Sequence, residues 1–194
     1  MSLIVNEEEK IFTLHTRNTS YQMMADRFGF LLHLYYGPRA EGRFDYLLPF
    51  GDRGFSGNPY EAGERKDYSL DSLPQEYPVR GSGDFRSPAL DLVNADGTYG
   101  CDLRFAGYSI EKGKYALAGL PAVYAEPEEA ETLKIYLEDR VSGVRVTLLY
   151  GVIEELDVIT RAVQVENISG QDIRLTREHQ SRKLWIFCGN TKGT

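Results

Sequence analysis

The chain has 194 residues, of which 42% are hydrophobic, and a formal net charge of −7 at pH 7. This length fits one domain, and the hydrophobic content is that of a packed globular protein rather than a disordered chain. Lys and Arg are scattered among more numerous acids, which argues against a nucleic-acid partner. No stretch reaches the roughly 18–20 apolar residues that cross a bilayer, so no membrane partner is expected.

The chain start and the cysteines indicate a compartment. Residues 1–10 carry acids where a secretory signal has basic residues and then an apolar run, so we expect a cytoplasmic protein. Cys101 and Cys188 belong to no CxxC pair and no Cys/His cluster with metal spacing. A disulfide between them is not needed in a cytoplasmic chain of this size. We therefore expect no metal and no cofactor.

Most of the chain has the period of β-strands. Residues 11–16 show the alternating side-chain pattern of a strand. Residues 30–36 form an aromatic and aliphatic run that ends at Gly37 and Pro38. A short connection containing Gly143 separates two further runs and predicts a hairpin. Strands at this spacing, with turn residues between them, indicate a sandwich or barrel. The later predicted strands are residues 133–139, 144–150, 158–166 and 173–176.

The middle of the chain differs from the predicted strands in its composition. Residues 49–100 contain many of the glycines and prolines, which predicts a long loop of the kind that often carries function. Residues 94–97 are a turn signal between expected strands at 90–93 and 101–105. The best helix candidate is a single turn at 127–131, so few or no helices are expected.

No catalytic set can be singled out from residue types. His15 and His33 fall in strands and are interpreted as sheet-face residues, whereas His179 lies in a polar, solvated stretch. For Asp84, the equal alternative to a catalytic role is a structural ion pair with Arg86 beneath a loop. Glycoside hydrolysis needs two carboxylates that flank one bond, and spacing does not choose among the candidates. These candidates are Asp71, Glu76, Asp84, Asp91, Glu154, Glu155 and Asp157.

Several segments together resemble one enzyme family. Each segment is weakly specific alone, but they follow one order over about residues 11–176. The chain is thereby similar to the bacterial α-galactosidases of glycoside hydrolase family 36. The segments are Phe12-x-Leu14-x-Thr16-x-x-Thr19-Ser20-Tyr21, Gly29-x-Leu31-x-His33-Leu34-Tyr35-Tyr36-Gly37, Ser69-Leu70-Asp71-x-Leu73-Pro74-Gln75-Glu76-Tyr77-Pro78, Gly83-Asp84-Phe85-Arg86-x-Pro88-Ala89, Asp102-Leu103-Arg104-Phe105, Gly119-Leu120-Pro121-Ala122, Ala130-Glu131-Thr132-Leu133 and Asp157-Val158-Ile159-Thr160-Arg161.

This resemblance implies an all-β fold, a large twisted two-sheet β-supersandwich like that of galactose mutarotase. In the family this region precedes a (β/α)₈ barrel, which supplies the aspartate nucleophile and the aspartate acid/base of a retaining mechanism. Residues 1–194 are therefore expected to be one accessory N-terminal domain without the catalytic barrel, inactive alone. In the whole enzyme its partners are α-galactoside sugars and further copies of the chain in a homo-oligomer.

The resemblance also implies a site. In the family, a loop of this domain reaches the active-site mouth of a neighbouring subunit, and residues 50–55 look like that loop. Asp52, Arg53 and Phe55 are the candidate substrate-binding residues in trans. The carboxylate of Asp52 would accept hydrogen bonds from sugar hydroxyls, and the ring of Phe55 would stack on a sugar face. The alternative is that both residues only shape the loop.

Beyond Leu175 the sequence departs from the family pattern, and residues 182–191 do not match it. We expect a naturally truncated reading frame, which downstream DNA would test. Two alternative functions stay open. One is a free-standing carbohydrate-binding or mutarotase-like module, in which His33 or His15 would have to act with a Glu. The other is an oligomerisation module.

Overall fold

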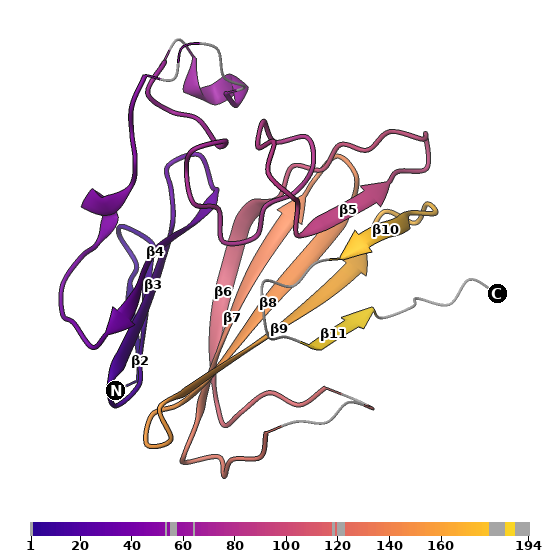
Figure 1. Cartoon of the computed structure of the whole chain (residues 1–194). Coiled ribbons are helices and arrows are strands. Elements are labelled where there is room, and N and C mark those ends of the chain that lie inside the picture. The colour runs from indigo at the N-terminus through magenta and orange to yellow at the C-terminus, as the bar shows by residue number, and fades with distance from the viewer. Residues whose placement is uncertain are drawn as a thin grey trace.

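The computed structural model describes residues 2–52, 54, 58–63, 65–117, 119, 123–178 and 185–188, and for residues 177, 178 and 185–188 only the backbone. Within these residues the protein consists of β-strands and two single-turn 3-10 helices (Figure 1). The elements are β1 (Leu3–Asn6), β2 (Ile11–His15), β3 (Thr19–Ala25), β4 (Leu31–Pro38), η1 (Asp45–Leu47), η2 (Tyr60–Ala62), β5 (Leu90–Val93), β6 (Arg104–Lys112), β7 (Glu131–Asp139), β8 (Val144–Ile153), β9 (Val158–Asn167), β10 (Arg174–Glu178) and β11 (Trp185–Cys188).

Two larger sheets and one strand pair organise the chain. Strands β1, β2, β3 and β4 form a four-stranded antiparallel meander, which is called sheet 1. The order β11-β9-β8-β7-β6 forms sheet 2, which is antiparallel except that β11 runs parallel to β9. The third element is the antiparallel pair of β5 and β10. Figure 1 shows sheet 1 in indigo beside the pink and orange strands of sheet 2.

The main core lies between the two sheets and β5. Apolar side chains of β2 and β3, such as Phe12 and Met23, share one buried cluster with those of β7 and β8, such as Ile135 and Val146. A second cluster lies on the other face of sheet 1, where Leu32 packs with side chains of residues 44–73. Sheet 1 is therefore covered on both faces, which explains why every residue of β2 is buried.

The predicted hairpin is confirmed. Strands β7 and β8 pair from Glu131↔Val152 to Asp139↔Val144, and the connection closes with Gly143 N–H donating to the Asp139 carbonyl at 3.0 Å. The Asp139 carboxylate also accepts bonds from the turn, including Val141 N–H at 2.8 Å and Ser142 Oγ–H at 2.7 Å. Burial would raise the pKa of Asp139, but these bonds lower it below its ordinary value.

The remaining sequence expectations have mixed outcomes. Residues 94–97 form the predicted turn, with Gly97 N–H donating to the Asn94 carbonyl at 2.9 Å. The strands on either side of it do not pair with each other, because β5 joins β10 and β6 joins β7. Residues 127–129 form a turn rather than a helix, and β1 and β3 are strands that the periodicity did not predict.

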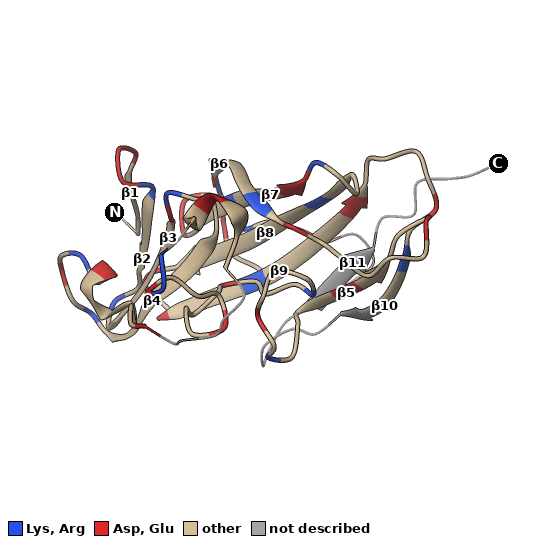
Figure 2. Cartoon of the chain, turned by 90° about the horizontal axis from the view of Figure 1, so that it is seen from above, with Lys and Arg blue, Asp and Glu red and all other residues tan. Residues whose placement is uncertain are grey.

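Charged side chains lie on the turns and on the strands of sheet 2 (Figure 2), whereas the strands β1 to β4 of sheet 1 carry no Lys, Arg, Asp or Glu. Several of them pair across neighbouring strands or within one turn. Nη2 of Arg145 in β8 lies 2.7 Å from Oε1 of Glu138 in β7. Nζ of Lys134 in β7 lies 2.6 Å from Oε1 of Glu111 in β6. Such partly exposed pairs each contribute little stability.

Candidate functional site

One buried polar cluster joins the two sheets, with Glu76 at its centre. Tyr21 of β3 and His33 of β4 approach it from sheet 1, whereas Tyr150 of β8 and Arg161 of β9 approach it from sheet 2. Glu76 belongs to the connection between β4 and β5. The Glu76 side chain is only 2% exposed, so it is a carboxylate placed inside the protein and surrounded by donors.

The backbone around Glu76 explains its position. Glu76 N–H donates to the Leu31 carbonyl at 2.9 Å, and His33 N–H donates to the Pro74 carbonyl at 2.8 Å. The segment therefore runs beside β4 as an added edge, with a bridge between Leu32 and Gln75. Successive side chains of an extended segment point to opposite sides, so fixing this segment on β4 turns Glu76 inward.

The contacts of Glu76 use both of its oxygen atoms. The hydroxyl of Tyr21 donates at 2.7 Å to each oxygen, and the hydroxyl of Tyr150 donates to Oε1 at 2.8 Å. Nη2 of Arg161 lies 2.5 Å from the same Oε1. Nδ1 of His33 lies 3.4 Å from Oε2 without the geometry of a hydrogen bond. Three donor groups, from Tyr21, Tyr150 and Arg161, therefore engage the Glu76 carboxylate.

These contacts set the protonation of the cluster. Burial raises the pKa of Glu76, but the charge of Arg161, the nearby His33 ring and the bond from Tyr21 bring that pKa below its ordinary value. Burial together with Glu76 raises the pKa of Tyr21, and burial raises that of Tyr150, well above the ordinary value. The cluster thus holds a carboxylate, a guanidinium and two neutral phenols at neutral pH.

A second ion pair, between Asp84 and Arg86, lies nearby and is the structural alternative that the sequence left open for Asp84. The two side chains form a bidentate pair at 2.8 and 2.7 Å. Nη2 of Arg86 also donates to the carbonyls of Leu70 and Leu73 at 3.0 and 2.7 Å, and Gln75 donates to Asp84 at 2.9 Å. The pair therefore fixes the connection that carries Glu76.

A cavity of about 630 Å³ opens beside this cluster and is called the inter-sheet cavity. Residues 74–78 and 86–89 line it, together with Tyr21 and His33 from sheet 1 and Arg161 and Val163 from sheet 2. Nearly all of these residues lie in the segments that resemble family 36. Segments far apart in the sequence thus converge on one hollow, whose size is that of a small-molecule site.

A larger cavity, of about 840 Å³, lies among the turns at 94–98, 139–143 and 168–173. Its polar groups are mostly used within those turns. Asp139 caps its own hairpin, and Asp96 accepts from Thr98 N–H at 2.9 Å. The turns that form this cavity are therefore held by hydrogen bonds of their own.

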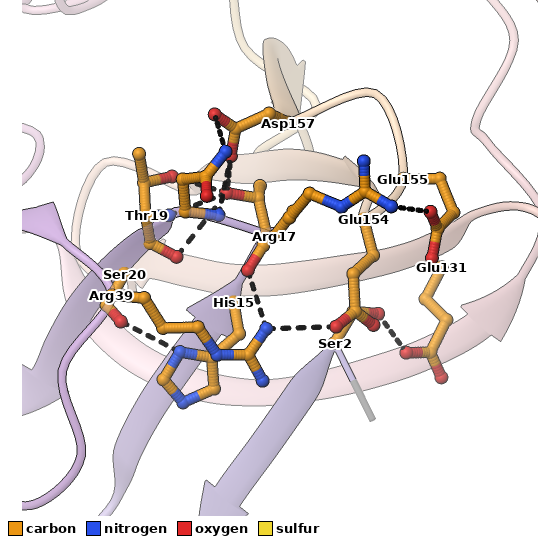
Figure 3. Close-up of polar contacts among 12 residues, drawn as sticks. Ser2, His15, Arg17, Thr19, Ser20, Arg39, Glu131, Glu154, Glu155 and Asp157 are labelled. Carbon is orange, nitrogen blue, oxygen red and sulfur yellow. Dashed lines mark hydrogen bonds and ion pairs between the residues drawn. The ribbon is translucent and has the colours of Figure 1, made fainter.

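A second polar contact area holds the ends of the two sheets together (Figure 3). The Asp157 carboxylate accepts bonds from the Thr16 hydroxyl and from Asn18 N–H, the latter at 3.0 Å. Arg17 pairs with Glu155 at 2.9 Å, and Arg39 pairs with Glu154 at 3.0 Å. The turn between β2 and β3 is thereby joined to the turn between β8 and β9.

The histidines occupy the positions expected of sheet residues. His15 ends β2 and is buried, and its Nδ1 is 2.8 Å from the Ser20 hydroxyl. Burial, together with the charge of Arg39, lowers the pKa of His15. His33 lies in β4, with its side chain 32% exposed. His179 lies outside the described residues.

The seven candidate carboxylates for glycoside hydrolysis do not form a free pair. Each has a donor of its own in the described structure, and those of Glu76, Glu154, Glu155 and Asp157 are given above. Asp71 accepts from Phe85 N–H at 3.3 Å, and Asp91 pairs with Arg80 at 2.8 Å. Among the described residues there is no group of three His, Cys, Asp or Glu side chains that could hold a metal. Cys101 is a free, buried thiol whose pKa burial raises.

The loop predicted to bind substrate is described only in part. Asp52 is exposed and accepts a bond from Gly54 N–H at 2.7 Å, while Arg53 and Phe55 lie outside the described residues. Nearby, Phe50 is 49% exposed and lies 5.9 Å from the Arg65 guanidinium. Asp52 does not line the inter-sheet cavity, so the structure separates it from the Glu76 cluster.

The model of the Glycosyl hydrolase family 36 N-terminal domain matches residues 29–181. The chain belongs to this family. It is 53% identical over 177 residues to the bifunctional alpha-galactosidase/sucrose kinase AgaSK of Mediterraneibacter gnavus, covering 91% of this chain and 19% of that protein. It is 42% identical over 179 residues to the alpha-galactosidase AgaA of Geobacillus stearothermophilus, covering 91% of this chain and 24% of that protein.

Solved structures agree with the family. The galactosidase domain of AgaSK superposes with a TM-score of 0.88 over 91% of this chain and 24% of that one. The alpha-galactosidase AgaB from Geobacillus stearothermophilus superposes with a TM-score of 0.83 at 42% identity, over 92% of this chain and 24% of that one. The resemblance and the all-β fold are thereby confirmed.

The chain spans only about a fifth to a quarter of these relatives, between 19% and 24% of their lengths. It corresponds to the N-terminal domain of the family 36 enzymes rather than to the rest of the protein. Within the described residues, no helix is long and apolar enough to cross a membrane.

The Glu76 cluster is the part of the site that residue types alone did not reveal. Glu76 was one of several candidate carboxylates, and Arg161 was only a residue of an expected strand. Two local signals point to them. Glu76 stands between Pro74 and Pro78, and Arg161 interrupts an apolar strand that packs in the core. A charge in such a place requires a buried partner.

Proposed function

We propose that this chain is the accessory N-terminal domain of a family 36 α-galactosidase, comprising residues 1–194, and that it does not itself hydrolyse α-galactosides. Family membership and the share of the relatives that it spans support this proposal. The engaged carboxylates support it further, because a retaining glycosidase needs two carboxyl groups about 5–5.5 Å apart and free to act on one bond.

The proposed contribution of the domain to catalysis is substrate recognition by the loop at residues 50–55. The Asp52 carboxylate is exposed and held at a tight turn by its bond with Gly54. An exposed carboxylate fixed in this way can accept bonds from the hydroxyls of an α-galactoside. Arg53 and Phe55 are proposed to line the same contact.

We also propose a homo-oligomer in which this loop meets another subunit. The segment that carries the loop exposes large apolar side chains, among them Tyr46, Leu47, Phe50 and Tyr60. Exposed apolar groups that gather on one segment are typical of an interaction surface. A cytoplasmic location fits the free thiol of Cys101, because cysteines stay reduced in that compartment.

A chimera tests the proposed role of Asp52. The matching N-terminal segment of the AgaSK galactosidase domain is replaced by this chain, and kcat/KM is measured on raffinose. Asp52→Asn is expected to lower kcat/KM about tenfold, the loss of one hydrogen bond to a charged group. Glu128→Gln, which alters an exposed acid on the connection before β7, is the matched control and should have no effect.

An Asp52→Asn chimera as active as its parent would contradict the recognition role. The mass of the particle in solution tests the oligomer separately. Light scattering on the chimera should give a multiple of the subunit mass, and a strict monomer at high concentration would contradict the shared site.

The alternative function as a mutarotase-like module receives one specific observation, the contact of His33 with Glu76. Mutarotation needs a base and an acid that are free to exchange protons. Glu76 already accepts from Tyr21, Tyr150 and Arg161 and is held ionised. The accessory domain is therefore the better supported function.

A further inference from the structure

We propose that the inter-sheet cavity beside His33 and Arg161 binds a neutral sugar, a single pyranose unit. Sugar binding at this cavity is independent of the proposed role of Asp52, because Asp52 is not among the residues that line it. The volume of about 630 Å³ lies within the usual range of small-ligand sites.

The charges around the cavity favour a neutral ligand. Glu76 pairs with Arg161 at 2.5 Å, and Asp84 pairs with Arg86 at 2.7 Å. Each pair cancels its own charge, so neither an anion nor a cation finds an unpaired opposite charge there. A sugar ring carries hydroxyls but no charge, so it avoids the cost of burying an ion without a partner.

Donors remain free for sugar hydroxyls. A guanidinium has five N–H groups, and Arg161 uses Nη2 for its contacts with Glu76 and Tyr150. Among the described residues, the N–H groups on Nε and Nη1 have no hydrogen-bond partner, and the Arg161 side chain is 23% exposed. The imidazole of His33 lies in the same wall and adds a donor or an acceptor.

Apolar rings form part of the remaining wall, beside the polar side chains of Gln75, Arg86 and Ser87. Pro74, Pro78 and Pro88 line it, and the ring of Tyr21 packs against His33 with a centroid distance of 4.8 Å. A pyranose presents C–H groups on one face, which pack well on rings of this kind. Few convergent polar groups set in an apolar, preformed wall are the usual composition of a ligand site.

The first experiment titrates the whole chain with methyl α-D-galactopyranoside and methyl α-D-glucopyranoside, with D-galacturonate as the charged comparison. Saturation-transfer NMR and calorimetry give the dissociation constants. We expect a neutral pyranose to bind saturably, with a Kd of about 1 mM or tighter. Galacturonate should bind no more tightly than the neutral sugars.

Two variants locate the binding. Ser87→Trp places an indole at the exposed mouth of the cavity and leaves the Glu76 cluster untouched. His33→Leu removes a polar group from the wall. Each should weaken binding about tenfold or more. Val141→Trp, at a turn residue that is 97% exposed, is the matched control for the indole and should bind as the parent does.

Asp52→Ala removes the carboxylate proposed for the loop, so pyranose binding that persists in this variant belongs to the cavity. Thermal unfolding shows whether His33→Leu is folded, and Ser87→Trp carries the test if it is not. The proposal is overturned if no neutral pyranose binds the folded chain saturably. It is also overturned if Asp52→Ala abolishes binding while Ser87→Trp does not.

Discussion

Nη2 of Arg161 lies 2.5 Å from Oε1 of Glu76. Arg161 belongs to β9 of sheet 2, whereas Glu76 belongs to the connection that runs beside β4 of sheet 1. Tyr21 and Tyr150 share the same carboxylate. The contact therefore links the two sheets through a buried charge pair. Removal of one member leaves the other charge buried without a partner, which is more costly than removing both.

A double-mutant cycle on this pair is the first prediction. Glu76→Gln and Arg161→Met are each expected to lower the free energy of unfolding by about 3–5 kcal/mol. The double variant should lose less stability than either single variant does, because neither charge is then left buried alone. Urea denaturation measures all four proteins. As a control, Arg17→Met with Glu155→Gln, a pair with side chains 64% and 80% exposed, should show negligible coupling.

The second prediction concerns the stability of the fold at acid pH. The pKa of Glu76 is lowered in the folded state from its ordinary value of 4.5, so the unfolded chain takes up the proton first as the pH falls. Its stabilising contribution is complete above about pH 4.5 and is lost as the pH falls through the folded pKa. Urea midpoints between pH 7 and pH 3 should therefore fall less steeply for Glu76→Gln than for the parent. Parallel curves would show that Glu76 does not titrate as described.

The third prediction concerns the hairpin between β7 and β8. Gly143 has φ +67°, and a Cβ there would lie 2.6 Å from Cβ and 2.7 Å from Cα of Ser169. Gly143→Ala is expected to cost about 2–4 kcal/mol, from a left-handed backbone together with overpacking. Gly170→Ala has a similar φ of +74° with no atom within 4 Å, so it should cost only the backbone strain of about 1 kcal/mol. Equal losses for the two variants would refute the steric part of this account.

The fourth prediction is that the chain does not catalyse mutarotation. Glu76 accepts from Tyr21, Tyr150 and Arg161, and His15 is buried against Ser20, so among the described residues neither Glu76 nor His15 is a free acid or base for a sugar. Polarimetry on freshly dissolved α-D-galactose should give the rate of buffer alone. A faster rate that disappears in His33→Leu would assign general acid/base chemistry to the inter-sheet cavity.

Local sequence patterns predicted the positions of the strands better than they predicted which strands pair with each other. The β7–β8 hairpin was predictable because its period of two and its Gly143 turn lie within one short stretch. The pairing of β5 with β10 was not, because those strands are far apart in the sequence and nothing local sets their register. The strands β1 and β3 were missed for a related reason. Ser20, Gln22 and other polar residues of β3 are buried by partners from distant segments.

The site follows the same rule. Glu76 could be named as a candidate carboxylate, but its donors come from β3, β8 and β9, and only folding brings these together. The resemblance to family 36 supplied what periodicity could not, since its scattered segments converge on the inter-sheet cavity. The interpretation of Asp52, Arg53 and Phe55 as substrate-binding residues stays a prediction.

Hydrolysis of an aryl α-galactoside by the purified chain tests the proposed accessory role most directly. Release of the aryl group is followed over hours at high protein concentration, with the galactosidase domain of AgaSK as the positive control. We predict the background rate, because each of the seven candidate carboxylates has a donor of its own and no two of them form a free pair. Turnover that copurifies with the chain and is saturable in substrate would contradict the proposal that this domain is not the catalytic one.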